Sequence, residues 1–370
     1  MSSSRLKIAY LVGTLNHGGL ESLVVDICKK HIDLDFEIVC VYRHEGTYSN
    51  AFHTTGVKMV QLECNNIFVY LYNLRRLLLN EHVNIVHAHT QSNALVCLFA
   101  LLGTSIPVMT TLHGFSFAKS GRMYRSIIYG GCKKLICVSQ YQLQYYKSMW
   151  HILDKHKIDV IYNGIDFSKI DSARLNVDFV SQTGRIQLAM VGSFMSGRSQ
   201  SVIIKSIALL KQRGVADFDF YFVGRRVDNE PARYDDCVRF CKEHKLTNVH
   251  FLGGREDVPS ILKAMDGFVY STEHDTFGIA VVEAMAAGLP VIVNDWTVMR
   301  EITNNGKWAT LFKTDDADDC ADKISELIHK LQTNREQVSR QCLEIANEVR
   351  NKFSIENHIK QLEQVYSSLS

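Results

Sequence analysis

Short apolar runs alternate with helical segments along almost the whole chain, and this alternation restricts the fold more than any other feature. In helical segments such as residues 19–31 and 141–150, apolar residues recur at every third or fourth position. The apolar runs are short enough to be strands buried on both faces. In the first half they occupy residues 7–12, 37–42, 58–62, 84–87, 107–112, 134–138 and 159–162. Strand and helix in succession predict a parallel, doubly wound sheet.

A polar stretch interrupts this pattern at residues 166–184, after which the alternation starts again. Further strands are predicted at residues 186–191, 218–223, 249–252, 268–271 and 291–294. A chain of 370 residues is also long for a single hydrophobic core. We therefore expect an α/β protein of two Rossmann-like domains, residues 1–170 and 171–354, with ligands at the carboxyl ends of the strands. An amphipathic helix at residues 355–369 could pack on either domain.

The composition excludes several classes of protein. The formal net charge of +2 argues against nucleic acid as the main partner. The ten cysteines include no C-x-x-C pair and mostly lie in apolar runs, as buried thiols do in a reducing compartment. No segment resembles a signal peptide, and no apolar run approaches the roughly 20 residues of a membrane span. We expect a cytoplasmic protein without a membrane span.

The charge is divided unevenly, because residues 1–175 hold 18 Lys and Arg against 12 Asp and Glu. Basic or amphipathic segments at residues 73–79 and 119–134, the latter with Arg122 and Arg125, are candidates for peripheral contact with the inner face of a membrane. An ordinary solvated helix face explains both segments equally well.

The first predicted strand is followed by a glycine-rich loop, residues 13–19, and then by a helix. Gly18 and Gly19 leave the backbone N–H groups at the start of this helix open to a phosphate. The spacing is not G-x-G-x-x-G, so a nicotinamide cofactor is not indicated. A simple tight turn would use the same residues.

The most informative segment is S-T-E-H-D-T-F-G-I-A-V-V-E-A-M-A-A-G-L-P-V-I-V-N at residues 271–294. Asp275 lies in a loop after a strand, and Glu283 lies eight positions later inside an apolar helix. Two acids at this spacing can bind separate hydroxyl groups of one extended ligand. The backbone N–H groups of Phe277, Gly278 and Ile279 would then face its phosphates.

Here the chain resembles the family-4 retaining glycosyltransferases of the GT-B fold. The resemblance continues in order along the chain, in G-G at residues 18–19, N-I-V-H-A-H at 84–89, T-L-H-G at 111–114, Y-N-G-I-D at 162–166 and V-G at 191–192. It implies an acceptor-side domain at residues 1–170 and a nucleotide-sugar-binding domain at residues 171–354. The last helix, residues 355–370, would cross back to the first domain.

The resemblance also implies roles for single residues. Asp275 and His113 would contact the donor sugar, Glu283 would bind the ribose, and Gly254 would border the nucleobase. The family usually has Glu where this chain has Asp275, which reaches about one methylene less far.

The second departure from the family pattern concerns the cationic residues that would bind the donor diphosphate. Where the family usually has Arg and then Lys, this chain has Ser193 and Arg198. Arg225 and Arg226 are candidates for the missing cation, although both are equally well explained as surface residues in a loop. Arg198 would stabilise the leaving diphosphate.

Three histidines could suggest zinc, but the family implies a metal-independent reaction, so we expect His87 and His89 to be packing or strand-end residues. We expect no cofactor, since the nucleotide-sugar is a substrate. The predicted activity is retaining transfer of a sugar, expected to be UDP-linked, to a glycan or lipid-linked hydroxyl in polysaccharide or glycolipid synthesis. The alternatives are a GT-B nucleotide-sugar epimerase and a catalytically silent nucleotide-sugar sensor.

Overall fold

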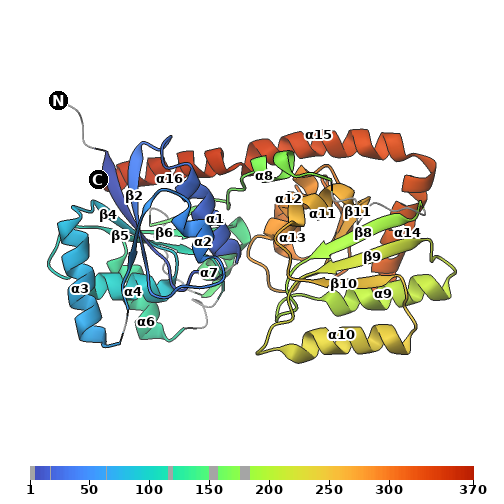
Figure 1. Ribbon diagram of the computed structural model, residues 1–370, viewed down its shortest axis with the longest axis horizontal. Coiled ribbons are helices and arrows are strands. Elements are labelled where there is room, and N and C mark those ends of the chain that lie inside the picture. Colours follow the sequence, from blue (N-terminus) through green and yellow to red (C-terminus); the bar gives the residue numbers. More distant parts are fainter. Residues whose placement is uncertain (1–4, 17, 64, 116–119, 150–156, 176–183) are drawn as a thin grey trace. The chain divides into compact units, whose positions relative to one another are not determined.

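The structure is a computed structural model that describes residues 5–16, 18–63, 65–115, 120–149, 157–175 and 184–370 (Figure 1). The chain divides into two compact units, Met1–Ile165 with Ser354–Ser370, and Asp166–Phe353. Residues 166–170, which the sequence pattern assigns to the first domain, thus belong to the second unit. Among the described residues, no helix combines the length and apolarity needed to cross a membrane.

The first unit contains a parallel sheet of seven strands in the order β3-β2-β1-β4-β5-β6-β7. The strands are β1 (Leu6–Leu11), β2 (Phe36–Tyr42), β3 (Lys58–Gln61), β4 (Ile85–Ala88), β5 (Val108–Leu112), β6 (Lys134–Cys137) and β7 (Ile158–Val160). The helices are α1 (Gly19–Lys29), α2 (Ser49–His53), α3 (Ile67–Asn80), α4 (Gln91–Ala100), α6 (Arg122–Gly131), α7 (Gln140–Met149) and α16 (Ile355–Leu369).

Helices cover both faces of this sheet because successive strand side chains point to opposite sides. Ile8 and Tyr10 of β1 pack in a core with α1 and α16, whereas Ala9 and Leu11 pack in a second core with α3, α4 and α6. The helix α16 contributes Tyr366, which is 1% exposed, and four further apolar side chains to the first core. The last helix therefore belongs to the first unit, which confirms the predicted return of the chain.

The second unit contains a parallel sheet of six strands in the order β10-β9-β8-β11-β12-β13. The strands are β8 (Ile186–Val191), β9 (Phe218–Val223), β10 (Val249–Gly253), β11 (Gly267–Tyr270), β12 (Val291–Asn294) and β13 (Thr310–Phe312). The helices are α8 (Ser168–Ser172), α9 (Gln200–Gln212), α10 (Pro231–Glu243), α11 (Val258–Ala264), α12 (Ile279–Ala286), α13 (Thr297–Ile302), α14 (Ala317–Thr333) and α15 (Arg335–Phe353). Figure 1 shows α9 and α10 on one side of the sheet and α11–α13 on the other.

The predicted doubly wound α/β fold is confirmed, with two differences. Strand β13 was not predicted, and part of the predicted polar stretch forms α8. Residues 176–183 of that stretch, and Lys119 of the basic segment, lie outside the described residues.

Candidate functional site

The strand order of the second sheet reverses between β8 and β11, and ligands of such sheets bind where the loops diverge at this point. The loops after these two strands pair through an antiparallel bridge between Arg198 and Thr272. Two backbone hydrogen bonds extend it, from the N–H of Ser199 to the carbonyl of Ser271 and from the N–H of Glu273 to the carbonyl of Gly197, each 3.1 Å long. The two loops are therefore held together as one structure.

Two glycines allow this close approach. Gly197 has φ +91°, and a Cβ there would lie 2.7 Å from the Cβ of His274. A Cβ at Gly192 would lie 3.1 Å from Cδ and 3.2 Å from Nη1 of Arg198. The absence of a side chain at Gly197 lets the two loops meet, and its absence at Gly192 lets the guanidinium of Arg198 lie against the backbone that follows β8.

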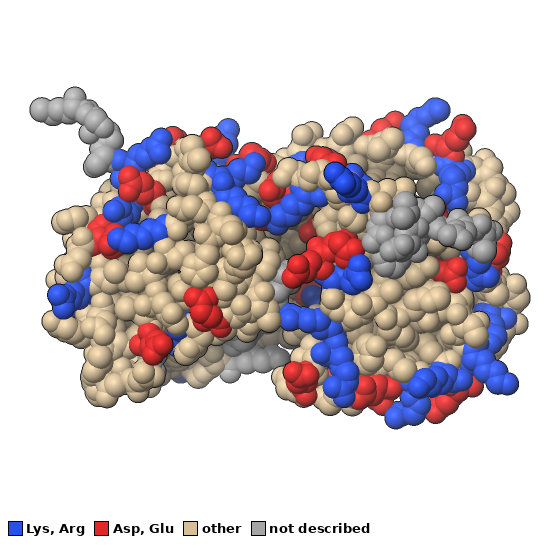
Figure 2. Space-filling view, in the orientation of Figure 1, with Lys and Arg blue, Asp and Glu red and all other residues tan. Residues whose placement is uncertain are grey.

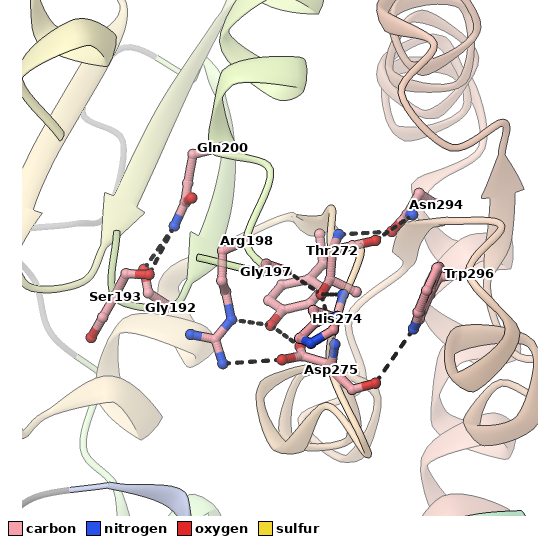
Figure 3. A network of polar contacts seen from close by, with 11 residues as sticks. Gly192, Ser193, Gly197, Arg198, Gln200, Thr272, His274, Asp275, Asn294 and Trp296 are labelled. Carbon is pink, nitrogen blue, oxygen red and sulfur yellow. Dashed lines mark hydrogen bonds and ion pairs between the residues drawn. The ribbon is translucent and has the colours of Figure 1, made fainter. Parts of the chain in front are cut away.

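Arg198, Tyr270 and Asp275 form a closed triangle of polar contacts (Figure 3). Nε of Arg198 donates to the Tyr270 hydroxyl at 2.6 Å, and Nη2 of Arg198 lies 3.4 Å from Oδ1 of Asp275. The Tyr270 hydroxyl donates to Oδ2 of Asp275. The structure thus brings together two of the three residues predicted to act in catalysis, and it adds Tyr270, which was not predicted.

The electrostatics of the triangle favour a charged Arg198 and a neutral Tyr270. Interaction with Tyr270 and then with Asp275 raises the pKa of Arg198, against the opposing effect of burial. Burial raises the pKa of Tyr270, so this phenol stays protonated. The result is a guanidinium and a carboxylate linked through a neutral hydroxyl.

The loop that carries Asp275 is anchored to β12. The buried amide of Asn294 accepts from the N–H of Thr272 at 2.9 Å and donates to the carbonyl of Thr272 at 2.7 Å. The hydroxyl of Thr272 donates to the carbonyl of Gly197 at 2.6 Å and accepts from the N–H of Asp275 at 3.2 Å. Trp296 donates to the carbonyl of Asp275 at 3.4 Å. A chain of well-satisfied polar groups therefore fixes the backbone at Asp275.

The predicted phosphate-binding residues lie at the start of α12. Gly278 has φ +91° and precedes the first helical residue, Ile279, while Phe277 is 2% exposed. The first N–H groups of a helix lack acceptors within it and can bind an anion. Glu283 lies in the second turn of α12 and is half-buried. The roles of these four residues stay predictions.

The residues considered for the missing cation have different surroundings in the structure. Ser193 is half-buried, and its carbonyl accepts from Nε2 of Gln200 at 3.2 Å. Arg226 forms a two-point ion pair with Asp235, with hydrogen bonds of 2.9 and 2.8 Å. Arg225 is exposed and lies against Gly254, where a side chain would overlap its Cγ. The guanidinium of Arg198, by contrast, lies against Gly192 at the start of the β8 loop.

The glycine loop of the first unit has a different environment. Gly18 precedes α1 in an extended conformation, and a Cβ there would lie 2.6 Å from Oε2 of Glu21. Burial raises the pKa of Glu21. A carboxyl group thus lies beside the predicted phosphate contact at Gly18 and Gly19, which stays a prediction.

The predicted histidines form a column at the strand ends of the first sheet. The rings of His87 and His89 stack at 4.3 Å, and Nδ1 of His89 lies 3.5 Å from Nε2 of His113. His87 hydrogen-bonds the hydroxyls of Tyr366 at 2.7 Å and Thr111 at 2.8 Å. Both of its ring nitrogens are therefore engaged in hydrogen bonds within the first unit.

Burial lowers the pKa of His87 and of His113 to about 3, so all three rings are neutral at physiological pH. His113 forms the half-exposed end of the column. Within the described part of the chain, no three His, Cys, Asp or Glu side chains are grouped as metal ligands would be.

Comparison with known proteins assigns the family. The model described as Glycosyltransferase Family 4 matches residues 17–169, and the one described as Glycosyl transferases group 1 matches residues 185–330. A glycosyltransferase of Methanocaldococcus jannaschii, named as uncharacterised, is 25% identical across 95% of each chain. The UDP-Gal:alpha-D-GlcNAc-diphosphoundecaprenol alpha-1,3-galactosyltransferase of Escherichia coli is 24% identical over 82% of this chain and 81% of the other.

Solved structures agree on the fold. The crystal structure of Anabaena HepE in complex with UDP and glucose has a TM-score of 0.83 at 18% identity, and the match covers 98% of this chain and 100% of the other. The two family models match successive parts of the sequence, the first mainly in the first unit and the second in the second unit, and together they span most of the chain. The chain belongs to the family-4 glycosyltransferases, and its two parallel sheets have the GT-B fold.

Proposed function

We propose that this glycosyltransferase transfers a sugar from a UDP-sugar to a hydroxyl acceptor with retention of the anomeric configuration, without a metal ion or other cofactor. The observation that carries the proposal is the contact between Arg198 and Asp275 at the reversal point of the second sheet. A nucleotide-sugar presents a diphosphate beside a ring of hydroxyl groups. A guanidinium can bind the diphosphate, and a carboxylate beside it can accept hydrogen bonds from the sugar hydroxyls.

Four of the candidate residues have a direct role in this proposal. Arg198 neutralises the leaving diphosphate, and Asp275 binds sugar hydroxyls together with His113. Glu283 binds the ribose. Uridine is favoured because the Escherichia coli relative is named for the donor UDP-Gal and the Anabaena structure is a complex with UDP and glucose.

The proposed chemistry needs no protein base. The acceptor hydroxyl attacks from the face that the diphosphate leaves, and the departing phosphate oxygen takes its proton. The positive charge for this step comes from Arg198 and from the N–H groups at the start of α12, which takes the place of a metal ion. His113 is neutral, so it would contact the sugar by hydrogen bonding and not by charge.

A lipid-linked acceptor at the inner face of a membrane fits the surface of the first unit. Helices α3, α4 and α6 carry Arg75, Arg76, Arg122 and Arg125 but no Asp or Glu. Their exposed apolar side chains include Phe68 and Met123, each 78% exposed. Figure 2 shows few charged side chains over this part of the molecule. The Escherichia coli relative is named for the acceptor alpha-D-GlcNAc-diphosphoundecaprenol, which is a lipid-linked sugar.

Vesicle binding tests the membrane contact. We expect the protein to co-sediment with phosphatidylglycerol vesicles more than with phosphatidylcholine vesicles, and less at high salt. Replacing Phe68 and Met123 by Ser should weaken this binding. Leu343→Ser removes an apolar side chain that is 61% exposed in the second unit, and it should change nothing. Absence of binding at low salt would remove the membrane contact from the proposal.

A thermal-shift screen with UDP, GDP, ADP and their common sugars, with and without magnesium, tests the donor. We expect UDP compounds to raise the melting temperature equally in both conditions. NMR of the product then reports the anomeric configuration. An isomerised donor formed without acceptor would indicate an epimerase, and binding without release of nucleotide under any acceptor would indicate a sensor.

A further inference from the structure

Tyr270 is more deeply buried than the two charged residues of the proposed donor site. It is the last residue of β11 and is 1% exposed, whereas the side chains of Arg198 and Asp275 are 25% and 17% exposed. Its hydroxyl contacts both of them. A ligand can therefore reach the outer atoms of the charged groups but not the phenol that joins them.

The direction of the two hydrogen bonds follows from the chemistry of the groups. Nε of Arg198 can only donate, and an ionised Asp275 can only accept. Tyr270 must accept from the first and donate to the second, and a single neutral hydroxyl satisfies both requirements. Burial raises the pKa of Tyr270, which keeps the required proton in place.

Arginine is the side chain that this arrangement requires at position 198. Its Nε–H bonds Tyr270 while Nη2 reaches Asp275, so the planar guanidinium is fixed by two separate atoms. A lysine has three N–H donors on a single nitrogen, so it cannot reach the two partners from two separate, rigidly joined atoms. The carbon of the guanidinium also lies 5.9 Å from the centre of the Tyr270 ring.

We propose that Tyr270 is a positioning residue of the donor site, whose hydroxyl holds Arg198 and Asp275 at a fixed separation so that one meets the diphosphate and the other the sugar. The inference rests on the proposed function. It assigns to a buried side chain a part in donor binding that acts only through its two neighbours.

The Tyr270→Phe variant tests this inference, because it keeps the buried ring and removes only the hydroxyl. We expect about a tenfold loss in affinity for UDP by calorimetry, since hydrogen bonds to charged groups are stronger than neutral ones. Tyr221→Phe is the matched control. It changes a tyrosine of strand β9 in the same sheet, which stacks on His250 at 4.8 Å, and UDP affinity should be unchanged.

A double-mutant cycle with Arg198→Lys separates positioning from general destabilisation. If Tyr270 acts through the guanidinium, Tyr270→Phe should cost less than about threefold in UDP affinity when it is combined with Arg198→Lys. An equal loss in both backgrounds, or no loss from Tyr270→Phe alone, would overturn the inference and leave the proposed function intact. A wild-type protein that binds neither UDP nor UDP-glucose would overturn the proposed function, and the inference with it.

Discussion

The two sheets have equivalent strand orders, but the residues at their reversal points differ in kind. Between β1 and β4 lie Tyr10, His87 and His89, whose rings are buried and neutral. Between β8 and β11 lie Arg198 and Asp275, which are charged and partly exposed. The topology decides where polar strand ends meet, and the side chains decide what can bind there. The second unit therefore presents charged groups at this point, and the first presents neutral hydrogen-bonding groups.

The largest expected effect comes from removing the guanidinium of Arg198 in the second unit. Arg198→Ala should lower turnover of the nucleotide-sugar by about 10²–10³, because a preorganised donor to a leaving group contributes on that scale. The measurement is release of nucleotide under saturating donor. Arg226→Ala is the control, since this arginine is paired with Asp235 and should be dispensable for turnover. Unchanged turnover in Arg198→Ala would show that the charged site is not catalytic.

Acid should affect the first unit through its buried histidines. Burial lowers the folded-state pKa of His87 to about 3 and that of His358 to about 4, below the usual imidazole value of about 6.5. Between these values the unfolded chain binds protons that the folded protein does not. The contribution of these histidines to the free energy of unfolding is therefore fully present above about pH 6.5. As the pH falls toward 4, the free energy of unfolding decreases by up to about 1.4 kcal/mol per pH unit for each histidine.

Chemical denaturation at pH 7.5, 6 and 5, followed by hydrogen exchange in β4 and β5, measures this loss. His358→Gln removes one titrating group while an amide can still donate to the carbonyl of Tyr162, the partner of His358 at 2.7 Å. The free energy of unfolding of this variant should depend less steeply on pH. An unchanged slope would mean that these buried imidazoles do not set the acid sensitivity of the first unit.

The sequence predicted the strands well because most of them are continuous apolar runs between helices. Strand β13 was missed because it has three residues and its first, Thr310, is exposed. The helix at residues 355–369 was predicted with its observed ends, since its apolar residues follow one face. Local periodicity therefore accounts for most of the fold.

The site was only partly predictable. Arg198 and Asp275 were identified from motif positions, but their contact joins residues 77 apart. Tyr270 ends an apolar strand and carries no local signal for a polar role. In the first unit, His87 and His89 were expected to be packing or strand-end residues, and their rings stack, but the partner Tyr366 of His87 lies 279 residues away. Side-chain pairing across loops depends on packing that the sequence pattern does not encode.

The smallest expected effect concerns the backbone that supports the charged site. Gly197 and Gly214 both have positive φ, at +91° and +79°, but only Gly197 has a neighbour within reach of an added Cβ. Gly214→Ala should cost about 1 kcal/mol of unfolding free energy from the left-handed conformation alone and leave UDP binding unchanged. Gly197→Ala adds the contact with His274, so it should cost more and also weaken UDP binding, because the shift moves the loop that carries Asp275. Calorimetry and denaturant unfolding on both variants measure the difference. Equal costs and equal UDP affinities would mean that the close packing of the two loops does not position the charged residues, and that the contrast between the units rests on their side chains alone.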